Sequence, residues 1–205
     1  MKTEIRMFEF EVRADQNEEH GHFLTGQPIV YNERTNLGWC DEIIADGALT
    51  DTDLRDVRFL VNHNINMIPL ARSRNNNANS TMQMEVVPGS GMTIRVDLDT
   101  ENNADAKSLY SAVERGDISG MSFMMIVDGD SWSELDSDHP TRMVTSISKV
   151  FEVSAVTFPA YEATSISVRG LSEALDSAKE SLESARAAAR EIERKKQKIK
   201  ILLEV

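Results

Sequence analysis

The sequence predicts an α+β protein that is rich in β-strands and ends in a long helix. Three observations favour this class: apolar and polar residues alternate in several short segments, a Pro-Gly-Ser-Gly turn joins two of them, and the last 35 residues follow a helical repeat. The composition is globular, with 40% hydrophobic and 27% charged residues. At 205 residues the chain suffices for one buried domain and an appendage.

The strand candidates lie in the first 160 residues. Residues 8–13 alternate apolar and charged side chains, as a half-buried strand does. Residues 81–87 and 92–98 alternate in the same way, and the turn between them predicts a β-hairpin. Further strands are expected at 58–62, 121–127 and 143–159, with a polar break at 128–130.

Two segments have helical spacing. In residues 104–115 four apolar side chains share one helical face before Gly116 ends the helix. From Leu171 to Leu203 apolar residues recur at spacings of four and three, with Lys196 as the one interruption. We therefore divide the chain into a domain of residues 1–170 and a helix of residues 171–205. This helix could pair with a partner or simply pack on its own domain.

The charge distribution restricts the partners. The net charge is −12, and the last 35 residues carry eight Lys or Arg and seven Asp or Glu, so the first 170 hold −13. Such an acidic body repels phosphate backbones, so we expect no nucleic-acid partner. It could attract basic proteins or simply keep the protein soluble. Without an apolar run that could span a membrane or serve as a signal peptide, we expect no membrane association and no secretion. The single cysteine, Cys40, fits a reducing compartment.

The chain has four histidines, which are the candidates for metal binding or for acid–base catalysis. His20 and His22 stand beside two glutamates, but no further His or Cys cluster completes a metal site, so we expect no metal and no cofactor. His139 lies in an acidic loop. His63 follows the apolar run 59–61 at the end of an expected strand, where a histidine can be structural or can act as a general base.

Ser122 and Glu152 are the other candidates for chemistry. Ser122 lies where a Gly-containing stretch enters an apolar strand, which suits a nucleophile, although a plain loop has the same pattern and Ser119 competes for the role. Glu152 interrupts an apolar strand, so a buried partner should meet its carboxylate. That partner could be an imidazole or a structural Arg or Lys.

In four segments the chain resembles the prohead protease family of tailed bacteriophages, which is distantly related to herpesvirus assemblin. These segments are residues 42–49, residues 57–64 together with 69–72, residues 115–123 and residues 151–161. The resemblance implies a serine endopeptidase with Ser122 as nucleophile, in preference to Ser119, His63 as base and Glu152 as the residue that orients the ring. The backbone N–H groups around Ser122 and the side chain of Arg72 are candidates to bind the oxyanion.

The resemblance also implies an assemblin-like, mainly antiparallel β-barrel with flanking helices. Its expected substrates are the phage major capsid protein with its scaffolding segment and the protease itself, and we expect self-association. The expected location is the assembling procapsid in the host cytoplasm, with residues 171–205 as a docking or self-cleaved segment. Ala71 and Met124 stand where the family often has glycine. The alternatives are an inactive scaffold or capsid-assembly protein of the same fold and, ranked lower, a metal-dependent hydrolase that uses His20 and His22.

Overall fold

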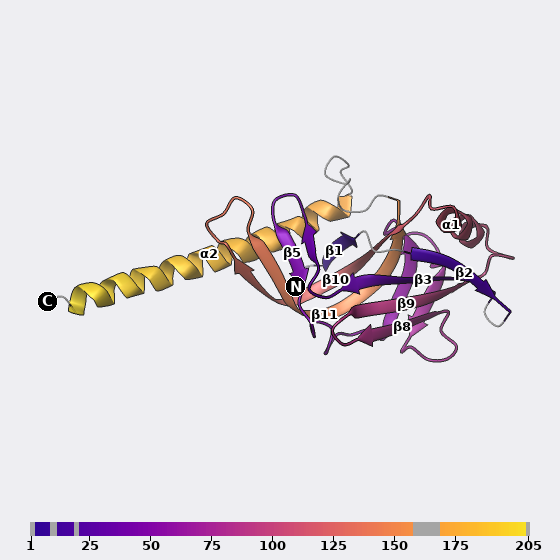
Figure 1. Ribbon diagram of the computed structural model, residues 1–205, viewed down its shortest axis with the longest axis horizontal. Coiled ribbons are helices and arrows are strands. Elements are labelled where there is room, and N and C mark those ends of the chain that lie inside the picture. The colour runs from indigo at the N-terminus through magenta and orange to yellow at the C-terminus, as the bar shows by residue number, and fades with distance from the viewer. Residues whose placement is uncertain (1–2, 9–11, 19–20, 158–168, 204–205) are drawn as a thin grey trace.

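The computed structural model describes residues 3–8, 12–18, 21–157 and 169–203 (Figure 1). In these residues two β-sheets and two helices account for the regular structure, so the expected α+β class is confirmed. The first sheet contains β1 (Thr3–Phe8), β4 (Arg34–Asn36), β5 (Asp41–Ile44), β6 (Asp56–Val61), β7 (Ala71–Arg74), β10 (Gly120–Ser133) and β11 (Thr141–Val156). The second contains β2 (Val12–Asn17), β3 (Gly21–Val30), β8 (Met82–Val87) and β9 (Gly91–Leu98).

The first sheet is organised around the long strand β11. β10 pairs antiparallel with β11 and has β1 on its other side. The first half of β11 pairs in parallel with β5, and its second half pairs in parallel with β6, which in turn pairs with β7. The second sheet has the order β2-β3-β9-β8, and its β8–β9 hairpin confirms the sequence prediction. Buried side chains from both sheets and from α1 form one hydrophobic core.

The closed β-barrel implied by the resemblance is not confirmed. Among the described strands, no backbone ladder joins the two sheets. β7 and β8 follow each other in the chain, one in each sheet, but the edge of β7 is bonded by side chains. The N–H groups of Arg72 and Arg74 donate to the hydroxyls of Thr81 and Ser80, at 2.9 Å each. These hydroxyl groups accept from the backbone N–H groups of β7 that would otherwise donate to β8 in a backbone ladder.

Two strand predictions need correction. Residues 8–13 were expected to form one strand, but β1 ends at Phe8 and β2 begins at Val12, and residues 9–11 lie outside the described part of the chain. The polar segment 128–130 was expected to separate two strands. It lies inside β10, where the β10–β11 register shifts between Val127 and Asp130. A β-bulge absorbs such irregular residues without ending the strand.

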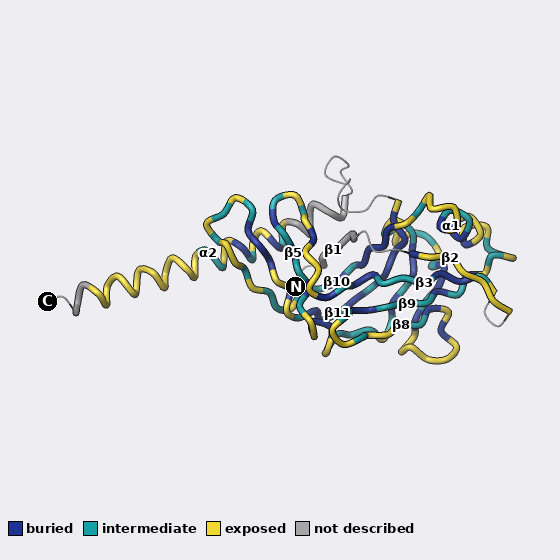
Figure 2. The backbone as a smooth tube through the Cα atoms, in the orientation of Figure 1, coloured by how far each residue is buried: buried dark blue, intermediate teal, exposed yellow. Residues whose placement is uncertain are grey.

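The two helices differ in how they pack. α1 (Ala104–Glu114) confirms the predicted amphipathic helix and buries the four apolar side chains that share its face. α2 (Arg169–Leu203) begins against the body, where Ala178 and Leu182 are buried and the hydroxyl of Ser181 donates to Asp130 at 2.7 Å. Beyond Arg186 it projects away from both sheets (Figures 1 and 2), and every residue from 187 to 200 is exposed. Neither described helix has an apolar stretch that could cross a membrane.

Candidate active site

Pairing of β10 with β11 places four side chains on one face of the first sheet. Ser122 is opposite Ser154, and Met124 is opposite Glu152, across the β10–β11 pair. Because side chains alternate between the two faces of a strand, all four point away from the face that buries Phe123 in the core. The serine and the glutamate predicted from the sequence thus lie on adjacent strands, one row apart.

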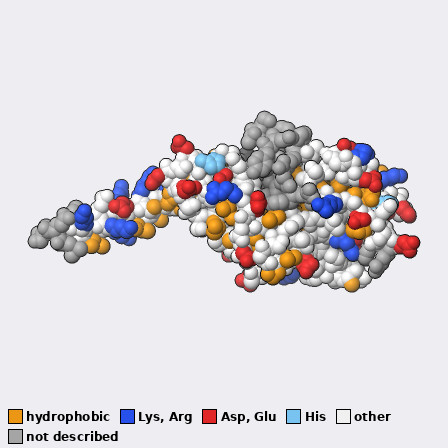
Figure 3. Space-filling view, viewed as in Figure 1, with side chains coloured by type: hydrophobic (Ala, Val, Ile, Leu, Met, Phe, Trp, Pro, Cys, Tyr) orange, Lys and Arg blue, Asp and Glu red, His pale blue; other side chains and the backbone are white. Residues whose placement is uncertain are grey.

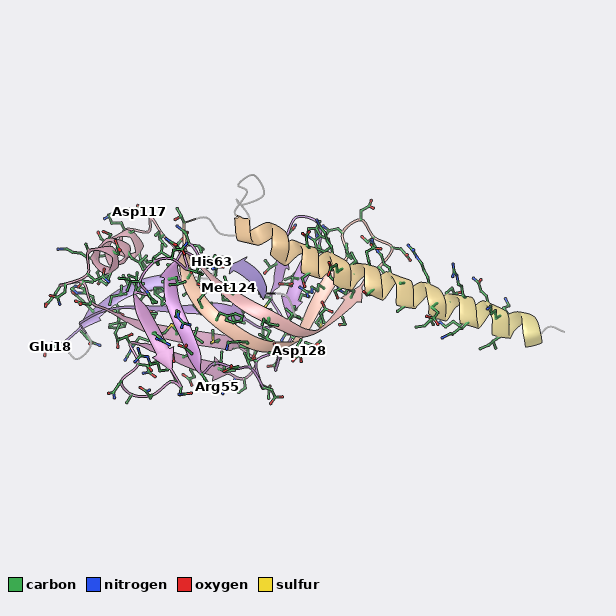
Figure 4. The ribbon with its side chains drawn as sticks, turned by 180° about the vertical axis from the view of Figure 1, so that it is seen from behind. Glu18, Arg55, His63, Asp117, Met124 and Asp128 are labelled. Atoms are coloured by element: carbon green, nitrogen blue, oxygen red, sulfur yellow. The ribbon has the colours of Figure 1, made fainter. Side chains whose placement is uncertain are left out.

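His63 reaches this face by a tight turn after β6. Asn62 and His63 both have positive φ, 51° and 54°, a conformation that non-glycine residues adopt only where the surroundings hold them. The Asn62 side chain supplies part of that support, because it accepts from the N–H of Thr157 at 2.9 Å and donates to the Thr157 hydroxyl at 3.0 Å. Figure 4 labels His63 and Met124 in the same part of the first sheet.

The imidazole of His63 joins the other two side chains. Its Nδ1 lies 2.6 Å from Oε1 of Glu152, and its Nε2 lies 2.5 Å from Oγ of Ser122. Since a carboxylate can only accept, Nδ1 donates to Glu152, and in a neutral ring Nε2 is then left to accept from the serine hydroxyl. The sequence predicted a buried partner for Glu152, and that partner is the imidazole of His63. The contacts form a continuous path from hydroxyl through imidazole to carboxylate.

A fourth residue, Ser154, fixes both the carboxylate and the turn. Its hydroxyl accepts from the backbone N–H of His63 at 3.1 Å and donates to Oε2 of Glu152 at 2.5 Å. Ser154 has no exposed surface. Sequence reasoning passed over it, although a small polar residue two positions after a buried glutamate lies on the same strand face and is a candidate to bond it.

The site is closed to solvent. Ser122 is 0% exposed, and the side chains of His63 and Glu152 are 6% and 3% exposed. Exclusion of water strengthens the electrostatic interaction between the imidazole and the carboxylate. It also means that a peptide bond can approach Oγ only after the atoms that cover Ser122 move.

Ser119, the competing serine, lies outside this group. It precedes β10 and is exposed, and its carbonyl accepts from the N–H of Val12 at 3.2 Å. The imidazole of His63 bonds the hydroxyl of Ser122 instead. Of these two serines, Ser122 is the one whose hydroxyl contacts an imidazole.

The two groups expected to bind the oxyanion, the backbone N–H groups around Ser122 and the side chain of Arg72, are less well placed for that role. β10 has a paired strand on each side at Ser122, so its backbone N–H groups point into the sheet ladders. The guanidinium of Arg72, on β7, donates twice to Asp56, at 2.6 and 2.8 Å. These hydrogen bonds lower the pKa of Asp56, against the opposing effect of partial burial. Two strands, β11 and β6, separate Arg72 from Ser122.

The other described histidines contact residues outside the site, and Nε2 of His139 lies 2.9 Å from Oδ1 of Asp41. His20 lies outside the described residues. His22 bonds the hydroxyl of Thr100 through Nδ1 at 2.7 Å and packs edge-on against Tyr110. In the described ranges no group of three or more His, Cys, Asp or Glu side chains could hold a metal ion.

Comparison with known proteins gives one family match. The model of the family described as "Caudovirus prohead serine protease" matches residues 8–180. Among solved structures, the bacteriophage T4 capsid assembly protease is similar over 78% of this chain and 100% of that chain, with a TM-score of 0.42 and 12% identity. No individually curated protein matches the sequence.

Proposed function

The chain belongs to the caudovirus prohead serine protease family, and from that premise we propose that it is a serine endopeptidase that cleaves its phage's capsid protein or scaffold, and itself, inside the assembling procapsid. One observation carries the proposal: the hydroxyl of Ser122, the imidazole of His63 and the carboxylate of Glu152 are joined by two short contacts. A hydroxyl, a base and an orienting acid in this order are the requirements for acyl transfer by serine.

In the proposed reaction Oγ of Ser122 attacks the scissile carbonyl carbon while its proton passes to Nε2 of His63. Glu152 stabilises the imidazolium. When the peptide C–N bond breaks, His63 gives the proton to the leaving amine, and the acyl group stays on Ser122. Water then attacks the acyl carbon and gives a proton to Nε2 of His63. As the ester bond breaks, His63 passes that proton to Oγ of Ser122, and the acid product leaves.

Co-expression with the phage's own capsid protein tests the function. We expect mass spectrometry to find shortened capsid protein, with one defined new terminus, only in cells that also express this chain. Capsid protein that stays at full length in assembled procapsids would contradict the proposal and would favour an inactive assembly protein of the same fold.

Ser154 is proposed to position the catalytic pair. Ser154→Ala is expected to lower kcat on the order of 10²-fold with little change in KM, because the ring and the carboxylate lose a shared anchor. Unfolding should also require about 1–3 kcal/mol less, because buried polar groups of His63 and Glu152 lose a partner. Steady-state kinetics and urea unfolding measure the two effects.

A matched control is Ser73→Ala. Ser73 is equally buried, and its hydroxyl has no hydrogen-bond partner among the described residues. We expect this variant to keep wild-type kcat. Equal kcat in the Ser154 and Ser73 variants would rule out the positioning role.

We further propose that the projecting part of α2 docks on an acidic helix of the scaffold. The apolar seam that is buried at Ala178 and Leu182 continues through Ala189 and Ile192 to Ile199, where it is exposed. Residues 186–200 contain seven Lys or Arg and two Glu, and basic side chains gather along this part of the helix (Figure 3). An acidic amphipathic partner would cover the seam and balance the charge.

Aspartates on this seam test the docking. The double variant Ile192→Asp, Ile199→Asp is expected to reduce incorporation into procapsids on the order of tenfold. Its Tm should stay within about 2 °C of wild type, since both residues are exposed. Gln197→Asp, off the seam, is the control. Unchanged incorporation of the double variant would refute the docking role. Sedimentation of the same samples separately measures whether the protein self-associates, as expected.

A further inference from the structure

A cavity of about 370 Å³ lies beside the Glu152 end of the catalytic group. Six apolar side chains line it: Leu60, Ile65, Met67, Pro69, Met124 and Phe151. Its polar lining comes from Arg58 and Glu152. A volume of about 300–1,000 Å³ and mostly apolar walls are typical of cavities that bind small groups. A larger cavity of about 800 Å³ lies over the second sheet, along β3, β8 and β9, and contains no residue of the catalytic group.

The position of the cavity relates it to the scissile bond. Met124 follows Ser122 by two residues on the same strand face, which corresponds to about 7 Å along a strand. An extended substrate covers that distance with two residues. The turn that carries His63 continues into Ile65, Met67 and Pro69, so one segment supplies both the base and part of the cavity wall.

We propose that this cavity is the subsite for a large apolar side chain of the substrate, such as Leu, Ile, Met or Phe, within about two residues of the scissile bond. The inference rests on the proposed protease function and adds a substrate class to it. Met124 fills space on this face that glycine would leave empty, so it helps to set the depth of the subsite.

The charged side chains that line the cavity further restrict which substrate side chains can bind there. Arg58 is 41% exposed and bonds Asp56 at 3.2 Å, so a guanidinium stands at the cavity. Both carboxylate oxygens of Glu152 are already bonded, by His63 and Ser154. A lysine or arginine side chain would meet apolar walls and the Arg58 guanidinium, so it is a poorer occupant than a large apolar side chain.

Cleavage of a proteome-derived peptide library tests the subsite. Wild type is expected to cleave bonds with a large apolar residue enriched at one position within two residues of the bond, and with Lys and Arg depleted there. Ile65→Ser should lower kcat/KM for the preferred peptides on the order of tenfold, since it removes apolar wall. Ile68→Ser is the matched control, because Ile68 is in the same loop and exposed but does not line the cavity. Cleavage without apolar enrichment, or equal losses in the two variants, would overturn the proposal.

A binding measurement separates this inference from the protease function. NMR titration of the Ser122→Ala variant with N-acetyl-leucinamide should shift the methyl signals of Ile65, Met67 and Met124, whereas N-acetyl-lysinamide should not. Those shifts, together with a wild-type chain that cleaves no peptide, would support the subsite and contradict the protease function. Absence of the shifts would overturn the subsite whether or not the wild type cleaves peptides.

Discussion

Replacing Ser122 with alanine is expected to reduce kcat by about 10⁴- to 10⁶-fold, to the level set by binding alone. The hydroxyl of Ser122 is the group that His63 contacts through Nε2, and no acyl-enzyme can form without it. Because alanine is close to serine in size, the fully buried site should keep its packing. Cleavage of a peptide from the capsid protein, followed by mass spectrometry under single-turnover conditions, measures the loss.

The matched control for this change is Ser119→Ala. Ser119 is exposed, three residues from Ser122, and lacks the contact with the imidazole. We expect its kcat to stay within a factor of about two of wild type, as surface substitutions usually allow. A large loss at Ser119 with activity retained at Ser122→Ala would move the nucleophile to Ser119.

The second large effect is expected for Glu152→Gln, with kcat lower by about 10⁴-fold. Ser154 accepts from the N–H of His63 and therefore donates its own proton toward residue 152. The carbonyl oxygen of a glutamine would take that donated bond, which turns its NH₂ group toward Nδ1 of His63. The ring proton would then reside on Nε2, facing the Ser122 hydroxyl, and the base would be blocked.

Glu85→Gln, the same change at an exposed glutamate of β8, controls for the loss of one negative charge. Stopped-flow kinetics on the capsid-derived peptide would compare the two variants. Full activity of Glu152→Gln would mean that the carboxylate neither orients nor stabilises the imidazole, and a purely structural role for Glu152 would follow.

Local patterns in the sequence predicted much of the fold. The hairpin of β8 and β9 and the helix α1 are encoded by alternation, turn residues and helical spacing within a few positions. The closed barrel that the resemblance implies is not confirmed, and the reason is not local. Closure depends on whether distant strand edges pair, and hydroxyl groups of Ser80 and Thr81 bond one such edge, which no local pattern reveals.

The sequence likewise predicted only part of the candidate site. The cost of burying Glu152 in an apolar strand predicted that a partner must exist, but not which one. Three distant features bring that partner to it: the parallel pairing of β6 with β11, the left-handed turn at Asn62 and His63, and the anchor at Ser154. Each depends on residues about 90 positions apart, so sequence spacing could not supply them.

Active-site labelling with a fluorophosphonate probe tests the central claim most directly. Mass spectrometry of digested wild-type protein should find the adduct on Ser122, and His63→Ala should slow its formation at least 10³-fold, since the hydroxyl then lacks its base. An adduct on another serine, or labelling of Ser122 at an undiminished rate in His63→Ala, would contradict the account.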